Sequence, residues 1–249
     1  MTDLHSHILP GIDDGASDWQ TSMQLLAQAE GQGIRNIALT SHFDCETTPL
    51  ELFLEERAAA FACLQDHLES DRFAFKLGCE ALYSPKLMNL DLHGLCLEGT
   101  EVLLLELPMG YRPAFFREVL SQIQSDGIIP LIAHVERYPY VLEDPRLLAD
   151  WLDAGAYMQV NGGSILQGGS RGKMALKFVK WGLAQVVATD AHSPRKRPPV
   201  LRQAMLEIEK QLGKPLADRL CRNAHDLFSG REPEDIPYHY PRKLLGQWV

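Results

Sequence analysis

Short apolar runs alternate with longer segments of helical periodicity along most of the chain. Met23, Leu26 and Ala29 recur three positions apart, which predicts an amphipathic helix that ends near Gly31. Residues 36–40 follow as a largely apolar run typical of a buried strand. By the same criteria we predict further helices at 49–68, 114–125, 147–153, 173–180, 200–212, 216–222 and 224–228. We predict further strands at 73–77, 102–105, 128–133, 157–160 and 186–189.

This alternation predicts an α/β protein with a parallel sheet. With the short apolar start of the chain counted as a strand, seven strand–helix units follow one another without interruption. Seven such units favour a closed or nearly closed barrel over an open sheet. No linker, low-complexity tract or internal repeat divides the sequence, so we expect residues 1–249 to form a single domain.

Histidines and acids recur just beyond the predicted strands. His5 and His7 occupy alternate positions after the first strand, so their side chains share one face and can reach the same ion. The carboxyl ends of barrel strands converge on one rim, where active sites are built. Further polar residues in this position are His42, Glu80, Glu106, His134, Asn161, Asp190 and His192.

Composition narrows the range of functions. The 249 residues carry 24 Lys and Arg against 33 Asp and Glu, and the net charge of -9 disfavours a nucleic-acid or anionic-membrane surface. No apolar stretch is long enough to span a bilayer, and the chain does not begin like a signal peptide. The five cysteines are odd in number and lack CxxC spacing, which is typical of a reduced cytoplasmic protein.

Five histidines and at least three carboxylates on one rim exceed the ligand needs of a single ion. Imidazole and carboxylate ligands suit zinc, manganese and iron alike, so the sequence does not rank these metals. Ions held roughly 3.5 to 4 Å apart activate a bridging water and clamp a phosphate. The pattern therefore predicts metal-assisted hydrolysis.

Arginines near the same strand ends indicate the substrate. Arg137 lies three residues after His134, and Arg195, Lys196 and Arg197 follow His192 within one loop. Guanidinium groups match phosphate oxygens in a bidentate manner and balance charge in the transition state. Phosphate ester hydrolysis is thus favoured over amide hydrolysis.

Taken together, these motifs resemble the PHP (polymerase and histidinol phosphatase) superfamily. The first stretch, His5-Ser6-His7-Ile8-Leu9-Pro10-Gly11-Ile12-Asp13-Asp14-Gly15, and the segment Arg197-Pro198-Pro199 resemble its CpsB/CapC branch of capsule-associated bacterial tyrosine phosphatases. The resemblance runs from Asp3 to about Leu227 and implies the PHP fold, a distorted (β/α)7 TIM-like barrel. The other motifs that carry it are Thr40-Ser41-His42, Gly78-Cys79-Glu80, Glu106-Leu107-Pro108, His134-Val135-Glu136-Arg137-Tyr138 and Asp190-Ala191-His192.

The resemblance implies three divalent metal ions, with manganese favoured and iron or zinc as alternatives. It implies that a metal-bridging hydroxide attacks phosphotyrosine while Arg137 and Arg197 bind the phosphoryl group, with Arg195 as the competitor of Arg197. Asp13 and Asp14 also fit a turn before Gly15. The implied ligands are His5, His7 and Asp190 for the first metal, Glu80 as a bridge, Glu106 and His134 for the second metal, and Asp14, His42 and His192 for the third.

The implied substrate is phosphotyrosine in a protein, namely the tail of a bacterial tyrosine kinase of capsule or exopolysaccharide synthesis. We expect neither nucleic acid binding nor membrane insertion. Two alternatives stay open: hydrolysis of a small phosphate monoester such as histidinol phosphate, and a non-catalytic metal-binding module that docks a kinase. No cysteine precedes an arginine with CxxxxxR spacing, which excludes the cysteine-dependent tyrosine phosphatase loop. We interpret the remaining histidines as surface or packing residues, namely His67, His93, His225 and His239.

Overall fold

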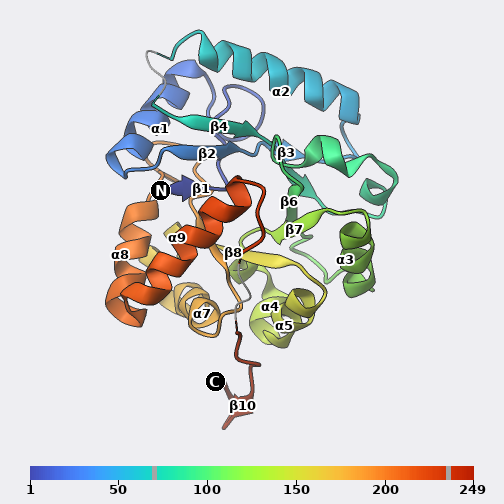
Figure 1. Ribbon diagram of the computed structural model, residues 1–249, viewed down its shortest axis with the longest axis vertical. Coiled ribbons are helices and arrows are strands. Elements are labelled where there is room, and N and C mark those ends of the chain that lie inside the picture. Colours follow the sequence, from blue (N-terminus) through green and yellow to red (C-terminus); the bar gives the residue numbers. More distant parts are fainter. Residues whose placement is uncertain (69–71, 234–236) are drawn as a thin grey trace.

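In the computed structural model, strands occupy the centre of the molecule and helices surround them (Figure 1). The structure describes residues 1–68, 72–233 and 237–249. The strands are β1 (Thr2–Asp3), β2 (Asn36–Leu39), β3 (His42–Phe43), β4 (Ala74–Leu77), β5 (Glu80–Leu82), β6 (Val102–Glu106), β7 (Ile129–Ile132), β8 (Tyr157–Asn161), β9 (Val186–Ala188), β10 (Lys243–Leu244) and β11 (Gln247–Trp248). The α-helices are α1 (Trp19–Gly31), α2 (Leu50–Gln65), α3 (Phe116–Ser125), α4 (Pro139–Glu143), α5 (Arg146–Asp153), α6 (Gly162–Gln167), α7 (Gly169–Lys180), α8 (Leu201–Leu212) and α9 (Lys214–Phe228).

Two parallel sheets form the centre, with strand orders β1-β2-β4 and β3-β5-β6-β7-β8-β9. They are parts of one ring, because β2 runs into β3 and β4 runs into β5 after breaks of two residues. The ring closes where the segment after β1 meets the segment after β9. There the His7 N–H donates to the Ala191 carbonyl at 2.9 Å and the Asp190 N–H donates to the His5 carbonyl at 2.8 Å. The predicted seven-stranded barrel is therefore confirmed.

A buried carboxylate reinforces this closure. Asp3 accepts hydrogen bonds from the backbone N–H and the hydroxyl of Thr189, at 2.9 and 2.5 Å. Burial raises the pKa of Asp3 to about 6, although the hydrogen bonds from Thr189 act in the opposite direction. The first and last strands of the barrel are thus joined through a side chain as well as through the backbone.

Alternate residues of β6 pack in two different hydrophobic clusters. On β6, Val102 and Leu104 pack in one cluster with Phe228 of α9, whereas Leu103 and Leu105 belong to the larger cluster with the surrounding helices. Helix α9 packs against β1, β2 and β9, and the Asn223 amide donates to the Gln185 carbonyl just before β9. Helix α9 therefore covers the amino ends of these strands, which leaves the carboxyl ends for a site.

Most predicted elements agree with the structure to within a few residues, and the larger differences among the helices concern α9, α7, α4 and α6. The helices predicted at 216–222 and 224–228 are one helix, α9, because buried Asn223 continues it. Helix α7 begins at Gly169 rather than at residue 173, directly after Gly168 with φ 68°. Helices α4 and α6 were not predicted, because their five and six residues are too few to show the i, i+3, i+4, i+7 pattern of an amphipathic helix.

The C-terminal segment forms a small antiparallel hairpin, β10–β11, that projects from the barrel (Figure 1). Its turn residues Leu245 and Gly246 both have positive φ, which is typical of a two-residue hairpin turn. Lys177 of α7 donates to the Trp248 carbonyl at 2.7 Å and ties the hairpin to the body. Within the described part of the chain, no helix combines the length and apolar character needed to cross a bilayer.

The two tryptophans at 151 and 19 provide a matched test of core packing. Trp151 is 2% exposed and packs edge-on against Phe116, whereas Trp19 is 38% exposed and stacks on His67. We expect Trp151→Ala to lower the free energy of unfolding by about 3 to 5 kcal/mol, because it leaves a large cavity. Trp19→Ala should cost about 1 kcal/mol or less in the same urea titration. Equal losses for both variants would contradict this description of the core.

Candidate metal centre

All nine predicted ligands lie at the carboxyl ends of the barrel strands. Two belong to the segment after β1 and one to the following loop. Two begin β3 and β5, which continue β2 and β4, one ends β6, one follows β7, and two belong to the loop after β9. In that order they are His5, His7, Asp14, His42, Glu80, Glu106, His134, Asp190 and His192. Their donor atoms converge, and three overlapping groups of them have atoms within 4.8 Å of one another.

The first group joins His5, His7 and Asp190. The Nε2 atoms of the two imidazoles lie 3.1 Å apart, and Glu80 Oε2 lies 3.2 Å from each of them. Asp190 Oδ1 lies 3.4 Å from His5 Nε2. This is the set that the family resemblance implies for a first metal, with Glu80 as a bridge.

The second group contains His42, Glu80 and Glu106, and His134 lies beside it. His134 Nε2 lies 2.7 Å from Glu80 Oε1 and 3.4 Å from Glu106 Oε1. His42 Nδ1 also approaches this place, at 3.1 Å from Glu80 Oε2. Glu80 therefore directs one oxygen toward His134 and the other toward His5 and His7, as expected of a bridging carboxylate.

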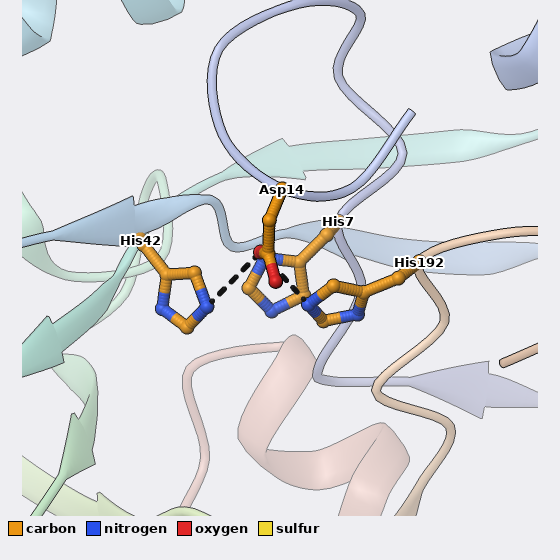
Figure 2. A group of neighbouring side chains, drawn as sticks. All are labelled: His7, Asp14, His42 and His192. Carbon is orange, nitrogen blue, oxygen red and sulfur yellow. Dashed lines mark ion pairs between the residues drawn. The ribbon is translucent and has the colours of Figure 1, made fainter. Parts of the chain in front are cut away.

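The third group contains Asp14, His42, His192 and His7. Figure 2 shows the Asp14 carboxylate between the two imidazoles of His42 and His192, with His7 beside them. Asp14 Oδ1 lies 3.4 Å from His42 Nε2 and 3.2 Å from His192 Nε2. The Asp14 carboxylate therefore lies among the donor atoms of this group, whereas the neighbouring Asp13 carboxylate contacts Nδ1 of His7.

Several buried atoms of this cluster lack a hydrogen-bond partner. Among the described residues they include Glu80 Oε2, Asp190 Oδ1 and His192 Nε2. Leaving buried polar atoms unsatisfied is costly, and here the atoms lie where ligand atoms of the three groups meet. Divalent ions would satisfy all three, so the residues present fit a multinuclear metal centre.

The charge balance of the cluster also favours cations. Burial and the nearby charge of Glu80 raise the pKa of Glu106 to about 7, because two carboxylates share a buried space. Burial lowers the pKa of His7, but the hydrogen bond with Asp13 and the nearby charge of Glu80 outweigh it and raise that pKa to about 10. Negative charge is therefore crowded into a buried space around Glu80 and Glu106, and metal ions would balance it.

Two of the candidate ligands have unusual backbone conformations. His134 has φ 32° and Asp190 has φ 54°, both in the left-handed region that non-glycine residues rarely adopt. Such residues cost on the order of 1 to 3 kcal/mol each and cluster at functional sites. Each residue lies two positions after a strand, β7 or β9, where the chain turns and the side chain lies in the cluster.

Asp13 contacts the Nδ1 side of one candidate ligand, His7. Its Oδ2 accepts from His7 Nδ1 at 2.7 Å and from the His42 N–H at 3.0 Å, while its Oδ1 accepts from the Gly15 N–H at 2.9 Å. The loop passes so close to His7 that a Cβ on Gly15 would lie 2.2 Å from the His7 carbonyl oxygen. The turn that the sequence predicts at Asp13 and Gly15 therefore also orients His7, which leaves Nε2 free for a metal.

Strand β8 contributes orientation rather than ligands. Gln159 Oε1 accepts from the His134 N–H at 2.8 Å and lies 3.2 Å from His5 Nδ1. The Gln159 amide donates to Asn161 Oδ1, and the Asn161 amide donates to Asp190 Oδ2, both at 2.7 Å. The signal for this relay was present in the sequence, because polar residues 159 and 161 alternate within an apolar strand.

The two predicted arginines meet at one carboxylate. Arg137 Nη1 lies 3.3 Å from Asp190 Oδ2, and Arg197 Nη2 forms an ion pair with the same oxygen. The loop after His192 turns back on itself, because His192 N–H donates to the Arg197 carbonyl at 3.0 Å. Arg197 therefore reaches the site, whereas Arg195 lies exposed in the turn.

Residues 1–229 match the protein-family model for capsular polysaccharide synthesis proteins of the CpsB/CapC type. The chain belongs to the CpsB/CapC family. Its resemblance to that branch, first seen in the N-terminal histidine motif, is thereby confirmed.

The CpsB/CapC relatives include tyrosine phosphatases. The chain is 31% identical over 238 residues to the tyrosine-protein phosphatase YwqE of Bacillus subtilis, covering 92% of this chain and 91% of the relative. It is 32% identical over 237 residues to the tyrosine-protein phosphatase CpsB of Streptococcus pneumoniae, covering 88% and 94%. A solved structure from work on YwqE and CpsB, described as unique metal-dependent tyrosine phosphatases, matches with a TM-score of 0.88 and 28% identity, over 98% of this chain and all of the other.

The residues interpreted as unrelated to the centre of this CpsB/CapC chain have other partners. His67 Nδ1 lies 2.8 Å from the Cys63 carbonyl, and His93 pairs with Glu101 at 2.7 Å on the surface. Asn36 of β2 lies beside His225, and the His239 backbone N–H donates to the Trp181 carbonyl.

The contact between Asp13 and His7 gives a direct test of this CpsB/CapC centre. Asp13→Asn keeps the size of the side chain but removes the charge that His7 Nδ1 faces, so we expect metal affinity to fall about 10- to 100-fold. Isothermal titration with Mn²⁺ measures the change. Asp18→Asn is the matched control, since Asp18 only caps α1 and asparagine also caps helices. An unchanged affinity in Asp13→Asn would show that Asp13 does not orient a ligand.

Proposed function

We propose that this chain is a metal-dependent protein tyrosine phosphatase. The observation that carries the proposal is the position of Asp190. One of its oxygens lies among the histidines of the metal cluster, and the other pairs with Arg137 and Arg197. The metal ligands and the phosphate-binding cations are therefore adjacent. The relatives named as tyrosine phosphatases support the same substrate class.

We propose three metal positions, with manganese as the favoured ion. The overlap of three ligand groups and the bridging position of Glu80 support three ions rather than one. The mixed imidazole and carboxylate ligands support manganese, iron or zinc. The proposed ligands are His5, His7 and Asp190 for the first ion, Glu80 as a bridge, Glu106 and His134 for the second, and Asp14, His42 and His192 for the third.

Metals bound there would supply Lewis-acid stabilisation of the phosphoryl oxygens and a water of lowered pKa as the nucleophile. The arginines of the chain bind and orient the phosphoryl group. Arg137 and Arg197 are 32% and 39% exposed, so a phosphate can approach them from solvent. Their guanidinium groups balance the charge that develops on the phosphoryl oxygens.

No cysteine acts as a nucleophile in this proposal. Cys79 precedes Glu80, but it is fully buried and its thiol donates to the Leu95 carbonyl. Burial raises the pKa of Cys79 well above its usual value, which disfavours the reactive thiolate. The chemistry therefore depends on the metal cluster.

We propose that the substrate is a phosphotyrosine-bearing protein of capsule or exopolysaccharide synthesis, such as the tail of a bacterial tyrosine kinase. The family model for capsular polysaccharide synthesis supports this setting. The cytoplasmic location expected from the cysteine pattern stays a prediction.

Removing the Glu80 carboxylate, the proposed bridge between two metals, should abolish phosphatase activity. We expect Glu80→Gln to lower kcat on a phosphotyrosine peptide by about 100-fold or more, because one ligand serves two metals and amides bind them weakly. Metal content measured by mass spectrometry should fall in the same variant. Glu101→Gln, on the surface beside His93, is the control.

Chelation of the wild-type protein should abolish phosphatase activity, and addition of Mn²⁺ should restore it. Full activity after chelation would contradict the proposal.

The substrate class is tested by comparing a phosphotyrosine peptide with histidinol phosphate on the Mn²⁺-loaded protein. We expect the peptide to have the higher kcat/KM. A higher value for histidinol phosphate would support the small-molecule alternative. No turnover of either substrate with Mn, Fe or Zn would support the docking-module alternative.

Arg197→Lys tests the phosphate-binding arginines. Lysine keeps the charge but loses the bidentate geometry, so we expect kcat/KM on p-nitrophenyl phosphate to fall about 10- to 100-fold. Arg195→Lys should leave it within about twofold, because Arg195 is exposed in the turn. If the two variants lost activity equally, the assignment to Arg197 would be wrong.

A further inference from the structure

A cavity of about 440 Å³ adjoins the proposed phosphate-binding arginines. It shares four residues with the site already described: Arg137, Asn161, Asp190 and Arg197. Its remaining walls come from α6, the start of α7 and the loop after β9. A polypeptide whose phosphotyrosine reached the arginines would place a neighbouring residue in or beside this cavity.

The cavity is lined by four cations but only one acid. The cations are Arg137, Arg171, Lys196 and Arg197, and the acid is Asp190. This excess is opposite to the composition of the whole chain, in which acids outnumber bases by 33 to 24. A cavity of this kind attracts an anion.

Two of these four cations are free to bind an anion. Arg137 and Arg197 pair with Asp190. Within the described ranges, neither Arg171 nor Lys196 has a carboxylate oxygen within 4.0 Å of its charged nitrogens. Arg171 lies in the first turn of α7 and Lys196 in the loop after β9, so two separate elements direct positive charge to one cavity.

The rest of the lining suits a side chain rather than a free ion. Leu166 of α6, Pro198 and Val200 supply apolar surface in the same cavity, and Leu166 is 40% exposed. Apolar surface beside cations matches the methylene groups and carboxylate of a glutamate or aspartate. Inorganic phosphate would gain nothing from these apolar residues.

We propose that Arg171 and Lys196 form a subsite for an acidic residue that flanks the phosphotyrosine of the substrate. The subsite rests on the proposed phosphatase function and specifies its substrate class. It selects among phosphotyrosine sequences, whereas the metals and Arg137 and Arg197 act on the phosphoryl group. Because both cations are exposed, the contribution is screened by salt.

The test measures kcat/KM of the full-length, Mn²⁺-loaded protein on matched peptides. Each peptide carries one phosphotyrosine and a single Glu or Gln at one of the two positions on either side. We expect Glu at one or more positions to raise kcat/KM about threefold to tenfold over Gln, and the ratio to fall as NaCl is raised. In Arg171→Gln with Lys196→Gln the ratio should approach one. A ratio near one in the wild type, or a ratio unchanged in the double variant, would overturn the subsite.

Matched controls separate the subsite from general electrostatics. Arg195→Gln and Lys173→Gln remove exposed cations next to the two proposed residues, but neither lines the cavity, so the Glu-to-Gln ratio should persist. Loss of the Glu-to-Gln ratio in these controls would contradict the proposal.

A peptide with a second phosphotyrosine in place of Glu tests which anion the subsite binds. A preference for this peptide without a preference for Glu would show that the carboxylate assignment is wrong. Wild-type turnover of p-nitrophenyl phosphate distinguishes failure of the subsite from failure of the phosphatase function, since only the latter abolishes it.

Discussion

The closure of the barrel between its first and last strands determines where the functional residues lie. The backbone bonds between His7 and Ala191 and between Asp190 and His5, with the buried Asp3–Thr189 contact, bring residues from both ends of the chain together. Parallel strands must all end at the same rim, so each strand then presents its last residue to a common centre. A change that opened this seam would separate the histidines after β1 from the ligands after β9, even if every helix remained folded.

The second constraint is electrostatic. The rim gathers buried carboxylates, among them Glu80 and Asp190, that water cannot solvate. Hydrogen-bonded imidazoles, the two arginines and bound cations are the available ways to balance them. Asp13 and Gln159 then keep the imidazoles of His7 and His5 in the orientation that directs Nε2 into the cluster. The barrel, the ligands and this supporting layer therefore depend on one another.

Much of this could be predicted from the sequence, because strand ends and ligand types are local signals. The periodicity predicted the barrel. Eight of the nine candidate ligands form the three groups of neighbouring donor atoms, and the ninth, His134, lies beside Glu80 and Glu106. The supporting contacts were harder to predict. Asp13 fitted a turn before Gly15. Polar residues 159 and 161 stood out within an apolar strand, but their partners could not be predicted, since the contacts of Asp13 and Gln159 depend on how strands and loops far apart in sequence pack. The choice of Arg197 over Arg195 likewise depended on a loop turning back on His192.

The divided role of Asp190 links two binding equilibria. Its Oδ2 neutralises Arg137 and Arg197, while its Oδ1 faces His5 and His192. A cation at Oδ1 would offset part of the negative charge of Asp190. Arg137 and Arg197 would then pair less strongly with this carboxylate and bind an anion more readily. By thermodynamic reciprocity, an anion on the arginines must then tighten cation binding by the same factor. In the proposed centre, a metal ion and a phosphate would therefore bind cooperatively through Asp190, and the affinity measured for either one would depend on the concentration of the other.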